Sequence, residues 1–277
     1  MRIALPFPSG RKPLIGVLHL PGLPGSPGWV AAGRPHLQVL IDLALGDAEA
    51  FLRAGFDGLI LENYGDVPFF PQAPPATTAL MTRLVHEVRA RFPATPLGVN
   101  VLRNDAAAAL SCALAAGAGF VRVNVHTGVA ATDQGLIEGR AAETLRLREG
   151  LGAGPGGPHP IAILADVLVK HARTLDQEDP AQATADVLQR GLADGVIVSG
   201  KATGAAPTVS RVREVHEAAG GAPVWLGSGL TPKSCPALVP WLDGAIAASA
   251  ARHEGKAGRP VDPERARALV EAFRAAC

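Results

Sequence analysis

Short apolar runs alternate with longer helical patterns eight times along this 277-residue chain, and this alternation constrains the fold more than any other feature. The runs carry few charged residues, as expected of parallel strands that are buried on both faces. They cover Leu14–Leu20, Gly58–Glu62, Leu97–Val101, Phe120–Val125, Ile161–Asp166, Gly195–Ser199, Val224–Gly227 and Gly244–Ala248. Eight such units predict an α/β fold, a (β/α)8 TIM barrel that forms a single domain over residues 1–277; an open doubly wound sheet is the alternative.

Composition narrows the classes of function. Hydrophobic residues make up 48% of the chain, which is enough for a large core, and the formal net charge is +1. No long basic or acidic run suggests nucleic acid or an anionic membrane surface, and no apolar stretch approaches the roughly 20 residues of a transmembrane helix. The three cysteines are widely spaced and form no C-x-x-C motif, which favours a reducing, cytoplasmic location.

Polar side chains gather where the predicted strands end. In a barrel of this kind the strand ends and the loops that follow them form the ligand site. Because a buried polar group without a partner costs roughly 1–3 kcal/mol, such one-sided clustering favours a ligand site, although strand ends are also where polar groups can reach water. Substrate-binding candidates in this set are Asn63, Asn100, Arg122, Asn124, Lys170 and His171.

Four members of the set could transfer protons. Glu62, Asp166, His19 and His126 come from four different strand ends and are candidates for general acids and bases. The same four could hold a divalent metal ion. No H-x-H or H-E-x-x-H spacing occurs, so a metal is not favoured, and the cofactor is left unknown.

The last three strand ends suggest an anion site. Gly227-Ser228-Gly229 and Ser249 have the placement of a barrel phosphate site, where small residues let backbone N–H groups approach the anion. Tight turns would also explain the glycines. The segment after the sixth strand adds Ser199, Gly200, Thr203 and Gly204. Lys201 in the same segment has a second interpretation as a Schiff-base nucleophile.

Several of these segments together resemble the BtpA family, also called the BtpA/SgcQ family. The matching stretches are Ile15–Pro27, Leu61–Phe69, Gly98–Asp105, Arg122–Val125, Asp133–Gly135, Glu138–Arg140, Ala165–Val167, Lys170–His171, Ser199–Gly204 and Gly227–Gly229. The resemblance implies a ribulose-phosphate-binding type of barrel, which agrees with the predicted phosphate site. One departure is Ala247-Ala248-Ser249, which stands where the family usually shows Val-Gly-Ser/Thr, so that Ala248 is expected to crowd the phosphate.

Three functions follow from these observations. The first is an enzyme of isomerase or lyase type that acts on a small phosphorylated metabolite by acid–base chemistry. The second is an aldolase that uses Lys201. The third is a non-catalytic assembly factor with a protein partner, which the resemblance implies because the family is named for a photosystem I biogenesis protein that is a peripheral membrane protein. No nucleic-acid partner is expected, and a homo-oligomer is left open.

Overall fold

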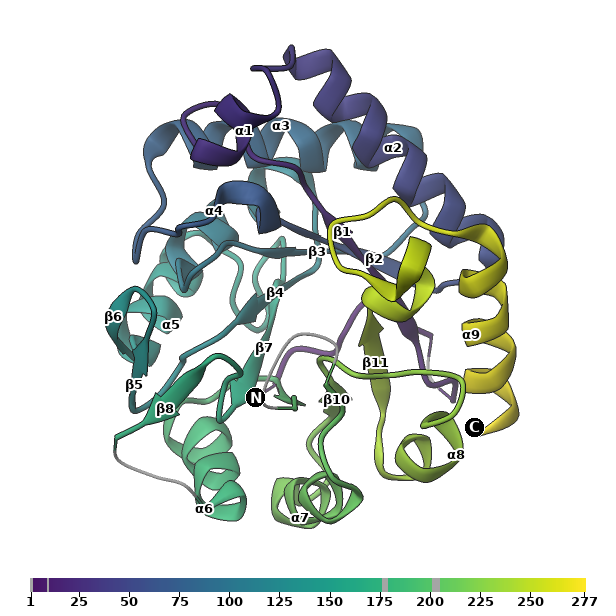
Figure 1. Cartoon of the computed structure of the whole chain (residues 1–277). Helices are drawn as coiled ribbons and strands as arrows, with labels where there is room; N and C mark the ends of the chain where they lie inside the picture. Colours follow the sequence, from purple (N-terminus) through teal and green to yellow (C-terminus); the bar gives the residue numbers. More distant parts are fainter. Residues whose placement is uncertain (1, 9, 176–178, 201–204) are drawn as a thin grey trace.

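Eight parallel strands close into a barrel in the computed structural model, which describes residues 2–8, 10–175, 179–200 and 205–277 (Figure 1). The predicted (β/α)8 barrel is therefore confirmed. The barrel strands are β1 (Leu14–His19), β2 (Gly58–Glu62), β3 (Leu97–Asn100), β4 (Phe120–Val123), β7 (Ala162–Val167), β9 (Gly195–Val198), β10 (Val224–Leu226) and β11 (Gly244–Ala247). Pairing of β1 with both β2 and β11 closes the ring.

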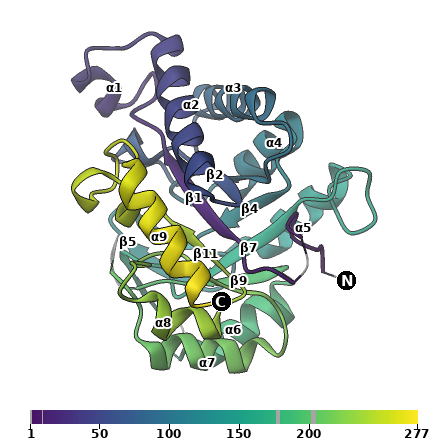
Figure 2. The ribbon, with the colours of Figure 1, turned by 90° about the vertical axis from the view of Figure 1, so that its right-hand side faces the viewer.

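Helices surround the barrel, and α9 packs beside α2 on its outside (Figures 1 and 2). The α-helices are α1 (Pro27–Ala31), α2 (Leu37–Ala54), α3 (Pro75–Arg91), α4 (Ala106–Ala116), α5 (Ala141–Gly150), α6 (Pro180–Ala185), α7 (Val209–Ala219), α8 (Cys235–Leu238) and α9 (Pro263–Ala275). Short helical turns are η1 (Tyr64–Asp66), η2 (Asp186–Arg190), η3 (Val239–Trp241), η4 (Ser249–Ala251) and η5 (His253–Gly255). No helix in the described ranges is long and apolar enough to cross a bilayer.

Side-chain caps begin several helices where the sequence predicts them. The Asp105 carboxylate accepts a hydrogen bond from the N–H of Ala108 at the start of α4, over 2.9 Å. Asp262 likewise caps α9, with Pro263 in the first turn. These carboxylates satisfy N–H groups that have no partner inside the helix.

Aromatic rings fill the barrel interior. Phe120 and Trp225 point inward and are buried, and the ring of Phe7 packs against both at 5.9 and 5.4 Å. Gly98 leaves room for Phe120, because a Cβ at that position would lie 2.2 Å from the ring. The interior is thus a packed core rather than a pore, and in this fold ligands bind above such a core, at the strand ends.

A small antiparallel sheet differs from the predicted pattern. It consists of β5 (Val129–Thr132), β6 (Gly135–Glu138) and β8 (Ala172–Thr174), and it lies on the side of the barrel away from α9 (Figure 1). The loops after β4 and β7 supply these strands, where the sequence analysis predicted no strand. A turn closes the β5–β6 hairpin, with the Thr132 hydroxyl donating to the Gly135 carbonyl over 2.9 Å.

Candidate active site

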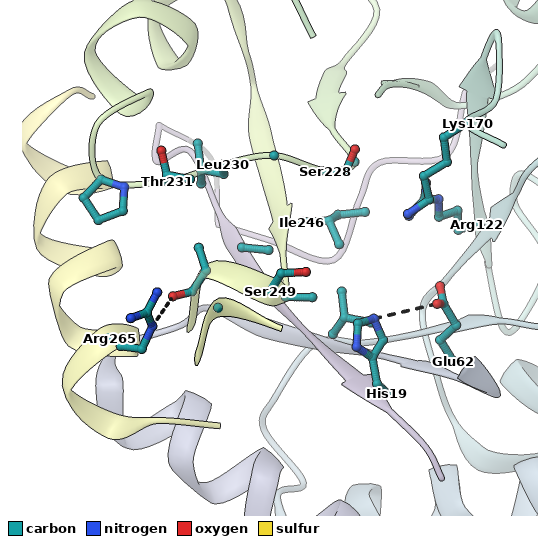
Figure 3. A pocket seen from close by; sticks show the side chains of 18 of the residues that line it. His19, Glu62, Arg122, Lys170, Ser228, Leu230, Thr231, Ile246, Ser249 and Arg265 are labelled. Carbon is teal, nitrogen blue, oxygen red and sulfur yellow. Dashed lines mark hydrogen bonds and ion pairs between the residues drawn. The ribbon is translucent and has the colours of Figure 1, made fainter. Parts of the chain in front are cut away.

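A cavity of about 360 Å³ opens at the strand ends (Figure 3). Strand ends on opposite sides of the barrel contribute to it. The sequence-predicted residues that line it are His19, Glu62, Arg122, Lys170, Gly227, Ser228, Gly229 and Ser249. Eight candidates chosen from sequence alone therefore share one cavity.

Barrel register places three polar side chains in a row. His19 is paired with Glu62 across β1 and β2, and Glu62 with Asn100 across β2 and β3. The Asn100 amide donates to Glu62 Oε2 over 2.6 Å, which orients the carboxylate. Glu62 Oε1 lies 3.8 Å from His19 Nε2, too far for a hydrogen bond. The carboxylate thus faces the cavity with one oxygen held by Asn100.

Surrounding groups keep His19 neutral and orient its ring. Burial lowers the pKa of His19 well below its usual value, and the charges of Arg252, Lys170 and Arg122 lower it further. The Gly258 N–H donates to Nδ1 over 3.2 Å, so the ring proton of the neutral form is on Nε2, the atom nearest Glu62. Tyr64 stacks on the ring with centroids 4.2 Å apart. His19 can therefore offer a proton into the cavity at neutral pH.

Arg122 lines the cavity and is hydrogen-bonded to a buried carboxylate. Asp166 accepts from Arg122 Nη2 at 2.9 and 3.1 Å and from Nε at 3.2 Å, and both side chains are buried. Burial opposes the charge on Arg122, but the carboxylates of Asp166 and Glu62 outweigh it and raise the pKa of the guanidinium. Asn124 donates to Asp166 over 2.6 Å. Arg122 is thus a fixed positive charge at the cavity wall.

The predicted phosphate segment forms another wall, from Gly227 to Gly229. Packing alone explains both glycines. A Cβ at Gly227 would lie 2.4 Å from Ile197, and Gly229 has a φ of +81° with Ala206 2.2 Å from its missing Cβ. A ligand is indicated instead by the N–H groups of Ser228 and Gly229, which have no acceptor among the described residues. These two donors lie at the same cavity as Ser249, at the start of η4.

Ala248 also lines this cavity, between β11 and η4. Its side chain also packs against the apolar cluster of the barrel interior that contains Ile246. The η4 turn beyond it is short, and Ala251 donates back to the Ala248 carbonyl over 3.1 Å.

Other predicted residues lie behind the cavity rather than on it. His126, predicted to be catalytic, does not line this cavity: it is buried, and its Nε2 lies 2.8 Å from the Gly191 carbonyl oxygen. The side-chain oxygen of Asn63 accepts a hydrogen bond from the Leu102 N–H over 2.7 Å and so fixes the loop after β3. Asp166 does not line this cavity; it holds Arg122, and together with Asn124 it lines a smaller cavity of about 50 Å³.

The remaining predicted residues are placed as follows. Ser199 is buried. Its hydroxyl lies 2.6 Å from the point where a Cβ at residue 227 would be, so it leaves no room for a side chain at Gly227. A Cβ at Gly200 would lie 2.2 Å from the Ala205 carbonyl oxygen, so packing explains this glycine. His171 is largely exposed beside β8 and does not line the cavity. Lys201, Thr203 and Gly204 lie outside the described residues.

Sequence reasoning missed residues that support the cavity. Arg252 is buried beneath it and donates to the Val17 carbonyl over 2.7 Å and to Asp47 over 2.7 Å. Arg265 lines the cavity beyond Ser249 (Figure 3). Tyr64 lies within a stretch that matches the family, so its position next to Glu62 and Asn63 was a usable signal, whereas Arg252 and Arg265 carry no sequence signal of this kind.

Within the described residues, no three His, Cys, Asp or Glu side chains come close enough together to hold a metal ion. The groups that line the cavity are a carboxylate, a neutral imidazole, the three cationic side chains of Arg122, Lys170 and Arg265, and a set of small residues with free donors. That combination suits proton transfer on a small anionic ligand.

Fold and cavity together define a (β/α)8-barrel protein with a polar site at the C-terminal ends of the strands. The chain belongs to the BtpA family, whose model matches residues 10–275. It is 44% identical over 264 residues to the Photosystem I biogenesis protein BtpA of Synechocystis, covering 95% of this chain and 88% of that protein. An uncharacterized protein of Thermococcus kodakarensis is 45% identical over 262 residues, covering 94% and 95%.

Solved structures of other barrels share the fold. Thiamine phosphate pyrophosphorylase from Pyrococcus furiosus superposes with a TM-score of 0.56 at 13% identity, covering 95% of this chain and 96% of that one. Phosphoribosyl anthranilate isomerase from Thermus thermophilus gives a TM-score of 0.55 at 12% identity, covering 95% and 99%. At such low identity these likenesses show the fold alone.

Proposed function

We propose that this protein is an enzyme of isomerase or lyase type that acts on a small phosphorylated metabolite by acid–base chemistry. One observation carries the proposal: the Glu62–His19 pair and the donor-rich wall from Gly227 to Gly229 line the same cavity. Two structural neighbours are named for phosphorylated compounds, which is consistent with it.

The residues suggest an order of events. The phosphate lies against the N–H groups of Ser228 and Gly229 and near Ser249, which holds the ligand in one orientation. Glu62 takes a proton from a carbon next to a carbonyl group. Neutral His19 donates its Nε2 proton to the carbonyl oxygen, as a weak acid matched to that task. Arg122 stabilises the negative charge that develops on the oxygen.

A thermal-shift screen tests the phosphate part of this proposal. Sugar phosphates and their unphosphorylated counterparts would be compared. A ligand at 100 times its Kd adds about 2.7 kcal/mol, or roughly 5–10 °C of melting temperature for a chain of this size. Ser249→Asp, which adds a negative charge at the cavity wall, is expected to abolish the shift. The control Ser111→Asp adds the same charge on the exposed face of α4 and is expected to keep it.

The chemical part needs a separate measurement. Candidate ligands would be incubated with the enzyme in deuterated water and followed by mass spectrometry. We expect deuterium to enter a ligand that shifts the melting temperature. Binding without exchange in any bound carbonyl compound would contradict proton abstraction by Glu62, while leaving the phosphate site intact.

A second candidate is the assembly function named in the Synechocystis relative. The observation that favours it is a surface groove of about 560 Å³ whose rim includes Phe70 and Leu136, each 62% exposed. Under this hypothesis Phe70→Ser or Leu136→Ser abolishes the cellular role and Glu62→Gln does not. Complementation of a Synechocystis strain that lacks the relative, using this chain and its variants, distinguishes the two functions.

We also propose that the chain is one domain that works in the cytoplasm. Its three cysteines are all free, and two of them are buried, which fits a reducing compartment. A single cooperative unfolding transition would support one domain, and light scattering would decide whether the chain forms a homo-oligomer.

A further inference from the structure

Lys170 projects into the candidate cavity (Figure 3). The chain has five lysines: Lys12, Lys170, Lys201, Lys233 and Lys256. Lys201 lies outside the described residues, and of the other four only Lys170 lines the cavity. It shares the wall with Arg122, across from Leu230 and Arg265 (Figure 3).

The backbone around Lys170 is held in an uncommon conformation. Leu168 and His171 have φ values of +52° and +55°, a region that residues other than glycine seldom adopt. Two arginines hold the carbonyls of this segment. Arg103 Nη2 donates to the Lys170 carbonyl over 2.8 Å, and Arg211 Nη2 to the Leu168 carbonyl over 3.2 Å. Such strained residues persist only where surrounding contacts enforce them, and they gather at functional sites.

The Lys170 amine has no acceptor or ion-pair partner among the described residues. Lys170 is half-buried and lines the cavity; a cation in such a position normally has a partner, because even partial desolvation is costly without one. Burial lowers the pKa of Lys170, and the Arg122 guanidinium lowers it further, against the smaller opposing effects of Glu62 and Asp166. A desolvated lysine beside another cation carries a larger fraction of neutral, nucleophilic amine than a surface lysine.

We propose that Lys170 forms an imine with the carbonyl carbon of a phosphorylated aldehyde or ketone bound in this cavity. This inference rests on the proposed function and specifies its substrate class. The amine lone pair attacks the carbonyl carbon, and the carbonyl oxygen leaves as water with the two hydrogens of the amine. Addition of one water reverses the step. No oxidant or metal is required.

An imine at Lys170 gives the neighbouring groups defined tasks. His19 donates its Nε2 proton to the departing oxygen, and the imidazolate regains a proton from the attacking amine nitrogen as water forms. Once the imine nitrogen takes up a proton from solvent, it withdraws electrons from the adjacent carbon more strongly than a carbonyl does, so that carbon loses a proton more easily. Glu62 accepts that proton. Burial and the neighbouring Arg122 both lower the pKa of Lys170 and so favour the neutral amine that attacks.

Pyridoxal 5′-phosphate is a suitable probe because it carries an aldehyde and a phosphate. The protein is treated with the probe, reduced with borohydride and mapped by mass spectrometry at each of the five lysines. We expect Lys170 to be labelled at least about fivefold faster than Lys12, Lys233 or Lys256 at neutral pH, because its amine is more often unprotonated. Inorganic phosphate is expected to slow the labelling of Lys170 and not that of the surface lysines.

Lys170→Arg and Lys201→Arg are the matched variants, since each keeps the charge and removes the amine. Labelling that persists in Lys201→Arg and is lost in Lys170→Arg supports the proposal. Labelling of Lys170 no faster than the surface lysines overturns it; if phosphate still raises the melting temperature, the phosphate site stands and only the imine fails. Preferred labelling of Lys201 also overturns it and transfers the covalent role there.

Discussion

The buried pair of Arg122 and Asp166 gives a quantitative prediction. Asp166→Asn keeps the shape of the side chain but removes the charge that accepts three contacts from Arg122, at 2.9, 3.1 and 3.2 Å, and one from Asn124 at 2.6 Å. The asparagine amide also places its own N–H donor against the donors of Arg122 and Asn124. The arginine is then a buried charge without its counter-ion.

The expected loss of unfolding free energy is about 3–5 kcal/mol, the usual cost of removing one partner of a buried ion pair. For a chain of this length that corresponds to a fall of roughly 6–20 °C in melting temperature. Urea denaturation followed by circular dichroism measures the first quantity and calorimetry the second. Glu217→Gln is the control, since it removes an exposed partner of Arg213 and is expected to cost about 0–1 kcal/mol.

Replacing both partners shows whether the loss of stability comes from the unpaired charge or from the change of side chain at each position. Arg122→Met combined with Asp166→Leu removes both charges and is expected to cost much less than the two single changes added together. An Asp166→Asn protein that unfolds within about 1 kcal/mol of the parent would refute the reasoning, because Arg122 would then not depend on Asp166 for its charge.

Four further outcomes are expected. Ala248→Gly removes the methyl group beside η4 and is expected to tighten inorganic phosphate binding roughly two- to fivefold by calorimetry, and unchanged affinity would place the anion elsewhere. Glu62→Gln keeps an acceptor for Asn100 and is expected to slow deuterium exchange at least about 100-fold with phosphate affinity retained. Gly98→Ala meets the Phe120 ring and is expected to cost about 1–3 kcal/mol in urea denaturation. Burial lowers the pKa of His126, so on acidification the unfolded chain takes up a proton at this residue before the folded chain does. The free energy of unfolding should therefore fall as pH drops below about 6.5, by at most about 1.4 kcal/mol per pH unit. His126→Gln should reduce this slope, and an unchanged slope would contradict a lowered pKa at His126.

The barrel could be predicted because its physical cause is local. Each strand is a short apolar run, and capping residues such as Asp105 and Asp262 mark where helices begin. The β5–β6 hairpin could not be separated from a loop, because its strands are four residues long and each contains only one buried residue. Residues 132–135 are of turn-forming types, but the residues on either side of them do not alternate strongly between apolar and polar.

The site could be predicted only in part. Sequence places polar residues near strand ends, and β-strand register then brings His19, Glu62 and Asn100 into one row. Sequence alone does not show which way each side chain faces. Asp166 lies at the end of β7 as Glu62 does at the end of β2, and His126 follows β4, yet His126 bonds to a backbone carbonyl and Asp166 to Arg122. Those partners come from distant parts of the chain, which a pattern of neighbouring residues does not contain.

A crystal structure with inorganic phosphate tests the central claim most directly. The claim is that a phosphorylated ligand lies in the cavity between the Glu62–His19 pair and the wall formed by Ser228, Gly229 and Ser249. The account predicts an anion that accepts hydrogen bonds from the N–H groups of Ser228 and Gly229. An anion bound only at another surface, with this cavity holding none at saturating phosphate, would contradict it.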